Sequence, residues 1–454
     1  MFDNSIEIGH EVLDKCSKKG MEKAEIFIAY NNVKQVTING RSISTQRAKE
    51  EIGAGIRVIH KNAVGFSYTN ILTRDALEKC ADEAFSIAKN SATIEGIGLA
   101  SKQKYSSVDG LYNQEIVNLS VEDITQDALD YIAGFTGIDD RVATVLSNIS
   151  ANVSGNAVIN TNGVEAQYKT AYYQASLMAL ASEQGRSGAY VFDTIFSRKH
   201  DANLKTVGEQ LGKKAIDNLN QKTIKAFDGE VIFRENAMLN PVVLTIAFAL
   251  SGENQQKGSS FWKDKLADKV ASEHFTMIDK PHNIQGATGV KPFDDEGNAT
   301  RQLELIKDGV LQMFVHNQKT ANKENLEPTG NAVRSLGGGM PKFAVPPTSI
   351  FPNSPWVQPG DMTEEELIED TKKGIILHNY QGTLRNENGL FSGVAKGAYL
   401  IEDGEIKYPV TGVSIAGNVF EIINNITGIG NELHLAAVVR TPLIRYKGIK
   451  ISTK

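Results

Sequence analysis

The sequence predicts an α+β fold, with an N-terminal domain built from a duplicated antiparallel sheet–helix unit (residues 1–222) and a β-rich C-terminal domain (residues 223–454). Two observations support this division. All twelve prolines lie at or after Pro241, and both tryptophans lie in the same half. Because proline is tolerated in turns and loops but not inside regular elements, the first half should contain long elements and the second half short strands and loops. Strand-like runs joined by short turns indicate antiparallel rather than parallel pairing.

The first unit is predicted to be a helix, a set of strands and a second helix. Residues 5–19 place their apolar side chains on one helical face, and Gly20 ends that helix. Thr73 is the expected N-cap of the second helix, whose apolar residues recur every three or four positions. Lys61-Asn62 predicts a tight turn between the last two strands. The strand-like runs are residues 24–30, 33–38, 52–60 and 63–69.

The second unit repeats this order. Ser120 is the expected N-cap of a helix, with Asp123 at the third helical position. Residues 142–196 are rich in strand-forming residues, and turns are predicted at 154–156 and 161–163. A polar helix should follow over residues 201–219. The two similar units suggest an internal duplication.

The C-terminal half contains fewer regular elements. A strand is expected at 231–233 and a buried helix at 237–251, because the latter is apolar on all sides. Thr363 and Glu366 form a capping box, and the segment 372–374 predicts the end of that helix. We therefore assign its acidic residues to helix capping and not to catalysis. Further short strands are predicted at 309–315, 398–401 and 406–410.

Composition restricts the classes of function. Lys plus Arg is 48 and Asp plus Glu is 54, so the formal net charge is −6, which argues against direct binding of nucleic acid. The longest apolar stretch, residues 241–250, is about half of the ~20 residues that a membrane span needs. Only Cys16 and Cys80 occur, and no secretory signal pattern is visible. We therefore expect a cytoplasmic protein that does not bind membranes.

Common catalytic motifs do not occur in the sequence. There is no Walker loop, dinucleotide fingerprint or G-x-S-x-G elbow, and Gly337-Gly338-Gly339 precedes Met340-Pro341 as a flexible loop would. Asp294, Asp295 and Glu296 lie together before Gly297. Neighbouring carboxylates could do acid–base work or hold a cation, but the same pattern is an ordinary hairpin turn, which we favour.

Four stretches together resemble the TldD/PmbA family, whose members were first named modulators of DNA gyrase and are understood as metalloprotease subunits. The resemblance covers nearly the whole chain in order. Its stretches are residues 51–58 with 64–67, 258–272, 293–311, and 410–418 with 429–432.

The resemblance implies a division of labour between two types of subunit. The TldD type carries H-E-x-x-x-H on a helix and a late cysteine, which bind zinc, with the glutamate as general base. The PmbA type, also called TldE, lacks them and pairs with the first as a heterodimer. Aligned through residues 252–253 and 257–260, the motif falls on Val243 and Phe248 at the histidine positions and on Leu244 at the glutamate position. The stretch 430–440 contains no cysteine.

Val, Leu and Phe have no donor atom for zinc, and without zinc and the glutamate no water is activated. The resemblance therefore implies a non-catalytic PmbA/TldE-like subunit that binds no cofactor itself. A TldD-like partner would supply the zinc for degradation or processing of unfolded peptides, and the chain could form a homodimer when alone. The residues left for a substrate channel or a structural turn are Glu253, Asp294, Asp295, Glu296 and Arg301.

Two other functions remain open at this stage. One is a stand-alone hydrolase with a site around Asp294, Asp295, Glu296 and Arg301. The other is a non-enzymatic regulator of DNA gyrase. The acidic composition argues against direct contact with DNA but not against a protein partner.

Overall fold

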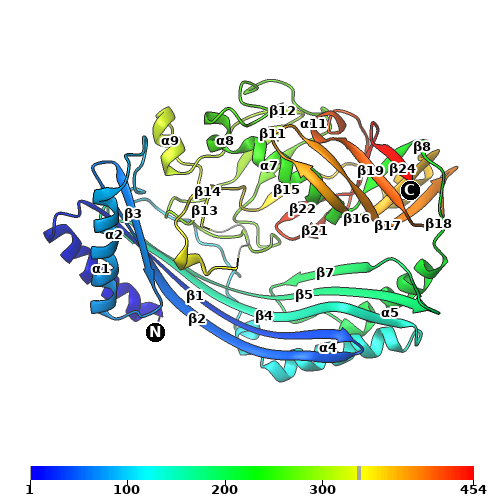
Figure 1. Cartoon of the computed structure of the whole chain (residues 1–454), viewed down its shortest axis with the longest axis horizontal. Coiled ribbons are helices and arrows are strands. Elements are labelled where there is room, and N and C mark those ends of the chain that lie inside the picture. The colour runs from blue at the N-terminus through cyan, green and yellow to red at the C-terminus, as the bar shows by residue number, and fades with distance from the viewer. Residues whose placement is uncertain (1, 335–338, 454) are drawn as a thin grey trace.

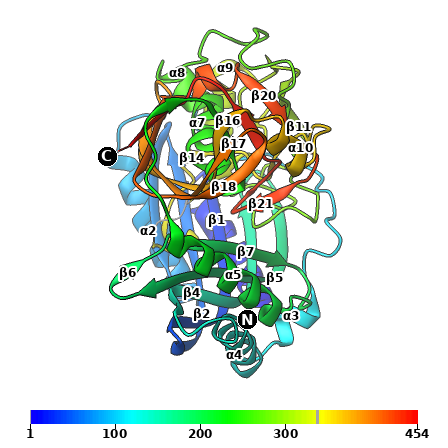
Figure 2. The same ribbon diagram turned by 90° about the vertical axis from the view of Figure 1, so that its right-hand side faces the viewer.

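The computed structural model describes residues 2–334 and 339–453, and it confirms the α+β class. Long antiparallel strands dominate the first half and short strands the second, with the C-terminal half seated over one face of the N-terminal sheet (Figures 1 and 2). Gly337 and Gly338 of the expected flexible loop lie outside the described residues. No helix of the described part of the chain is long and apolar enough to cross a membrane.

The described N-terminal residues form one seven-stranded antiparallel sheet in the order β3-β2-β1-β4-β5, with β6 and β7 both pairing with β5. β1 pairs with β2 on one side and with β4 on the other, so a single sheet joins the two predicted units. The strands are β1 (Lys23–Gly40), β2 (Ser42–His60), β3 (Ala63–Thr69), β4 (Val142–Asn160), β5 (Glu165–Glu183), β6 (Arg186–Ser187) and β7 (Val191–Ser197).

These strands are longer than the sequence predicts. The runs 24–30 and 33–38 are parts of the single strand β1. The turn at Lys61-Asn62 is confirmed, and both residues adopt positive φ. The turn predicted at 154–156 is wrong, because Gly155 lies inside β4, opposite Tyr30 of β1 and Lys169 of β5. Pairing on both sides outweighs the low strand propensity of Gly and Asn.

Helices cover one face of this sheet. α1 and α2 pack against Ile26 and Ile28, and α4 and α5 pack against Val36 and Ile38. The predicted caps are confirmed: Thr73 accepts from the amide of Ala76, and Ser120 with Asp123 forms a capping box. The opposite face is turned toward the C-terminal half (Figure 1). The helices are α1 (Phe2–Lys18), α2 (Arg74–Asn90), α3 (Gln114–Asn118), α4 (Val121–Thr136) and α5 (Leu204–Asp217), with a 3-10 turn at Asn218–Asn220.

Among the described residues from 227 onward, the strands form a nine-stranded, a six-stranded and a two-stranded sheet. The nine-stranded sheet comprises β8 (Phe227–Asp228), β9 (Glu230–Phe233), β16 (Lys373–Arg385), β17 (Leu390–Glu402), β18 (Glu405–Val410), β19 (Val413–Asn418), β20 (Ile426–Ile429), β23 (Ile444–Tyr446) and β24 (Lys450–Thr453). The six-stranded sheet comprises β10 (Met277–Asp279), β11 (Leu303–Lys307), β12 (Val310–Leu311), β15 (Pro355–Val357), β21 (His434–Ala436) and β22 (Val439–Thr441); β13 (Ala332–Val333) pairs with β14 (Ser349–Ile350).

The C-terminal helices are short. The helix predicted at 237–251 is interrupted, because Asn240 has φ −128° and ψ 111° before Pro241, and the residue before a proline disfavours helical backbone. The elements are α6 (Glu235–Ala237), a π-helical segment (Met238–Val243), α7 (Leu244–Leu250), α8 (Gly252–Gln256), α9 (Gln318–Glu324), a 3-10 turn (Lys342–Ala344), α10 (Glu364–Glu369) and α11 (Val419–Ile422).

Two further predictions in this half need correction. α10 begins at the predicted capping box of Thr363 but ends at Glu369, because Lys373 and Gly374 already belong to β16, where Gly374 pairs with Glu230. Of the strand predicted at 309–315, only Val310–Leu311 is paired as a strand. The strands predicted at 398–401 and 406–410 are confirmed within β17 and β18.

Candidate functional site

The three positions of the degenerate metal motif lie at the last residue of the π-helical segment, Val243, and in α7, at Leu244 and Phe248. Val243 is fully buried in the main C-terminal core. Leu244 and Phe248 are only half-buried, and their spacing of four places them on one face of the helix. The expectation that this segment is buried on all sides is therefore wrong for that face.

The half-buried face of α7 opens on a cavity of about 520 Å³. Apolar residues that line a cavity have the same hydrophobicity as residues that fill a core, so the sequence pattern could not distinguish the two cases. The cavity is lined by Leu244, Ala247, Phe248, Ser251, Glu253, Asn254, Lys257, Asn386 and the four residues from Thr348 to Phe351.

Glu253 is the carboxylate of this cavity, and two lysines hold it. Its Oε1 lies 2.8 Å from Nζ of Lys257 and 3.0 Å from Nζ of Lys319. Burial alone would raise the pKa of Glu253, but the hydrogen bonds and charges of the two lysines outweigh it and lower the pKa. Glu253 is therefore held as a paired carboxylate, which makes it a poor proton acceptor.

The zinc that the family resemblance implies does not fit these residues. Val243, Leu244 and Phe248 offer no nitrogen, oxygen or sulfur ligand, and Glu253 is already paired. The two cysteines are buried in α1 and α2, in the N-terminal core. Within residues 2–334 and 339–453, no group of three or more His, Cys, Asp or Glu side chains is arranged to hold a metal ion.

Asp294, Asp295 and Glu296 do form a turn, as predicted, but the turn is buried. Phe293 and Ala299 pair across it, and Oδ1 of Asp294 accepts from the amides of Glu296 and Asn298 at 2.9 Å each. All three residues are at most 2% exposed. The turn prediction is confirmed, and the burial of its three carboxylates is a feature that the sequence pattern did not indicate.

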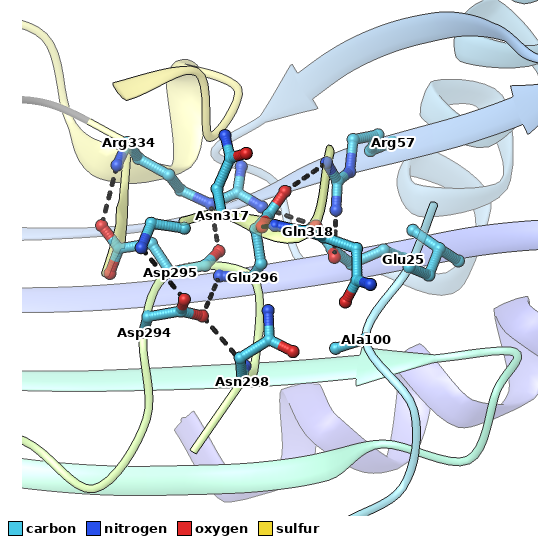
Figure 3. A network of polar contacts seen from close by, with 12 residues as sticks. Glu25, Arg57, Ala100, Asp294, Asp295, Glu296, Asn298, Asn317, Gln318 and Arg334 are labelled. Atoms are coloured by element: carbon cyan, nitrogen blue, oxygen red, sulfur yellow. Dashed lines mark hydrogen bonds and ion pairs between the residues drawn. The ribbon is translucent and has the colours of Figure 1, made fainter. Parts of the chain in front are cut away.

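These carboxylates join the two halves of the chain through arginines (Figure 3). Glu296 accepts from Nη1 of Arg57 on β2 at 3.0 Å. Glu25 on β1 accepts from Nη2 of Arg57 and from Nη2 of Arg334, at 2.7 Å each. Asp295 accepts from the amide of Arg334 at 2.9 Å. We call this set, together with Asp294, Lys342 and Lys291, the buried charge network.

The buried charge network balances its own charges. Asp295 lies 3.2 Å from Nζ of Lys342, and burial of its carboxylate is outweighed by Lys342 and Lys291, which lower the pKa of Asp295. Burial and the neighbouring Glu296 raise the pKa of Asp294 to about 7. A buried ion pair loses much of its gain to desolvation, so the network specifies how the halves meet more than it adds stability.

Arg301 does not join this network. It is exposed and donates from Nη1 to the carbonyl oxygen of Pro328 at 2.9 Å. The hydrolase site predicted around Arg301 and the three carboxylates is therefore not assembled.

Sequence reasoning missed Glu25, Arg57 and Arg334. The signal for Glu25 and Arg57 was a charged residue inside an apolar strand run.

Comparison with known proteins gives the family. Models of PmbA/TldA metallopeptidase domains match the chain in order: domain 1 over residues 24–88, the central domain over 114–219 and the C-terminal domain over 228–453. The chain belongs to the PmbA/TldD family. The matched segments cover most of its length, and all residues of the degenerate motif and of the carboxylate turn lie within the C-terminal match.

Relatives of this PmbA/TldD chain align over nearly their full length. Metalloprotease MJ0996 of Methanocaldococcus jannaschii is 25% identical, over 94% of this chain and 93% of that protein. A metalloprotease PmbA homolog of Haemophilus influenzae is 25% identical, over 94% and 92%. Among solved structures, TldE from Thermococcus kodakarensis has a TM-score of 0.87 at 22% identity, covering 98% of this chain and all of that one. A DNA gyrase modulator from Thermotoga maritima has a TM-score of 0.87 at 24% identity, covering 98% and 99%. The two structures show a shared fold.

Proposed function

We propose that this chain is the non-catalytic, PmbA/TldE-type subunit of a heterodimeric metalloprotease, and that a TldD-like partner supplies the zinc. The observation that carries the proposal is the chemistry of Val243, Leu244 and Phe248. The family resemblance aligns these positions with two zinc ligands and the general base, and none of the three side chains can bind a metal or accept a proton. Membership of the PmbA/TldD family, whose domain models are named for metallopeptidases, supports a role in proteolysis.

The role of this subunit would be to complete a channel for unfolded peptides. The face of the N-terminal sheet that is turned toward the C-terminal half supports this role, because most of its residues on β4 and β5 are uncharged and polar, with the charged Arg47, Lys49 and Glu51 confined to β2 at its margin. Cross-strand partners share a face, so the registers of β1, β4 and β5 define this set. It includes Gln35, Thr37, Asn148, Ser150, Asn152, Ser154, Thr170, Gln174 and Ser176.

These side chains already hydrogen-bond to one another. Gln35 and Thr37 both donate to Oδ1 of Asn148 at 2.8 Å, and Asn152 donates to Oγ of Ser150 at 2.9 Å. Amides and hydroxyls can exchange such bonds for bonds to a peptide main chain, which is the same in every sequence. The uncharged part of this face, on β4 and β5, therefore suits peptides of varied sequence better than a charged surface would.

A cleavage assay tests the proposal. The purified chain alone should not cleave an unstructured fluorogenic peptide, and addition of a zinc-bearing TldD-type chain should produce cleavage that a chelator abolishes. Co-elution of the two chains in size-exclusion chromatography should accompany the activity. Equal turnover by this chain alone in excess chelator would contradict the proposal and favour the stand-alone hydrolase.

A further inference from the structure

A second cavity, of about 430 Å³, lies between the N-terminal sheet and the segment 339–343 of the C-terminal half. Its sheet wall continues the polar face just described, and it adds the rings of Tyr168 and Tyr172 and the carboxylate of Glu51. The main lining residues are Tyr30, Asn156, Tyr168, Thr170, Tyr172 and Lys342.

Arg198, directly after β7, places a positive charge behind this wall. Its Nη1 donates to Oγ1 of Thr170 at 2.8 Å and to the carbonyl oxygens of Leu111 and Ala171 at 3.1 Å each. Its Nη2 donates to the carbonyl oxygen of Ala287 at 3.3 Å. Every one of these acceptors is uncharged, and Nε is buried with no partner in the described structure.

The other charges at the cavity are already paired. Lys342 lies 3.2 Å from Asp295, and Glu51 lies 3.1 Å from Lys49. The guanidinium of Arg198 is thus left as excess positive charge beside a polar cavity. A carboxylate is the natural complement of such a group, since charge-assisted hydrogen bonds are roughly twice as strong as neutral ones.

The cavity wall also provides neutral donors. The hydroxyl of Thr170 accepts from Arg198, so its own hydrogen is free to point into the cavity. Burial raises the pKa of Tyr168, to about 12, and that of Tyr172, despite the nearby positive charges of Lys342 and Arg198. Both phenols therefore keep their protons at neutral pH and can donate to a carboxylate oxygen.

We infer that this cavity binds a carboxylate group of a peptide ligand, with Thr170, Tyr168 and Tyr172 as donors and Arg198 as the charge behind them. The inference rests on the proposed function only in that the ligand is a peptide. The carboxylate is either the C-terminus of the peptide or an acidic side chain. In either case the contact recognises one anionic group of the peptide.

Fluorescence anisotropy with the full chain and three labelled peptides of glycine, serine and alanine tests the inference. The first has a free C-terminus, the second is amidated and has no acid, and the third is amidated and contains one glutamate. The second should bind at least about tenfold more weakly than the better of the other two. If only the peptide with a free C-terminus binds, the recognised carboxylate is the C-terminus. If the amidated peptide with one glutamate binds, it is an acidic side chain. Equal binding of all three overturns the inference.

Variants locate the contact. Arg198→Gln should weaken binding of the carboxylate peptide about tenfold, and Arg198→Lys less. Glu51→Gln should strengthen it by removing a like charge, and Tyr190→Phe, at an exposed tyrosine outside the lining, should leave it unchanged. Unchanged affinity in Arg198→Gln or in Glu51→Gln overturns the inference.

If Arg198→Gln does not fold, Tyr172→Phe takes its place and should weaken binding through loss of the phenol. Unchanged affinity in that variant would equally overturn the inference. These measurements need neither zinc nor a partner subunit, so their failure is separate from failure of the cleavage assay.

Discussion

His378 lies half-buried on β16, close to Arg234 and Lys214. Burial is the main cause that lowers the pKa of its imidazole to about 3, and the two cations act in the same direction. In the unfolded chain the same imidazole titrates near 6.5. Below that pH the imidazole is protonated in the unfolded state but stays neutral in the folded state. Acid therefore stabilises the unfolded state relative to the folded state through His378.

We expect His378→Asn to flatten the pH dependence of stability. The contribution of His378 is complete above pH 6.5 and is lost as the pH falls toward the folded-state pKa, by at most about 1.4 kcal/mol per pH unit. Urea denaturation at several pH values between 4 and 7.5 would measure the slope. His274→Asn, at an exposed histidine, is the control and should keep the wild-type slope. Identical slopes in wild type and His378→Asn would contradict the expectation.

Glu25 and Arg57 show how far single residues could be interpreted from the sequence. Each interrupts an apolar run, in A-E-I-F-I and G-I-R-V-I, which signals a buried charge that needs a partner. The partners Glu296 and Arg334 could not be predicted, because they lie hundreds of residues away and in loops with no periodicity. Local caps such as Ser120 were predictable because donor and acceptor lie within one helical turn.

At the scale of elements, α7 shows the limit of hydrophobic patterns. Ile246 is fully buried, whereas Leu244 and Phe248 line a cavity, yet all three are equally apolar. The spacing of apolar residues in a helix predicts which side chains face away from water. It does not predict whether the surface that they face packs against them or leaves a cavity. The predicted strands were too short for a related reason. β1 and β4 continue through polar residues because each pairs with a strand on both sides.

Two histidine substitutions on this helix should differ in cost. Val243→His would bury an imidazole in a filled core, with loss of packing and no partner, at about 2–5 kcal/mol of the free energy of unfolding. Phe248→His would place the ring at the cavity, where it keeps access to water, and should cost less. Thermal unfolding measured by circular dichroism compares them. Equal losses in melting temperature would show that the cavity face of α7 is as closely packed as its core face.

At the scale of the molecule, the buried charge network fixes how the two halves meet. Glu25 is central to it, because this carboxylate contacts one arginine from each half. Removing one partner from a buried ionic cluster leaves the others without compensation, which is more costly than the net gain from forming the cluster. In this chain the pairs Arg57–Glu296 and Glu25–Arg334 each join a residue of one half to a residue of the other.

Glu25→Gln should lower the free energy of unfolding by about 3–5 kcal/mol, because Arg57 and Arg334 lose their shared carboxylate. Glu22→Gln, at an exposed glutamate three positions earlier, should change it by less than about 0.5 kcal/mol. Denaturant titration measures both, and limited proteolysis reports whether the halves separate. A Glu25→Gln variant as stable as Glu22→Gln would show that the arginines find other acceptors.

The central ladder of the N-terminal sheet also affects the order in which the protein can form. β1 and β2 are adjacent in the chain and can pair as a hairpin at once, but β1 pairs next with β4, where Tyr30 meets Gly155. During synthesis one edge of β1 therefore stays unpaired from the end of β2 at His60 until β4, which ends at Asn160, has left the ribosome. An open strand edge is a template for wrong pairing. The charged run at Arg47, Lys49 and Glu50 lies on β2, the other strand of the hairpin, and would discourage pairing with other nascent chains along the outer edge of β2.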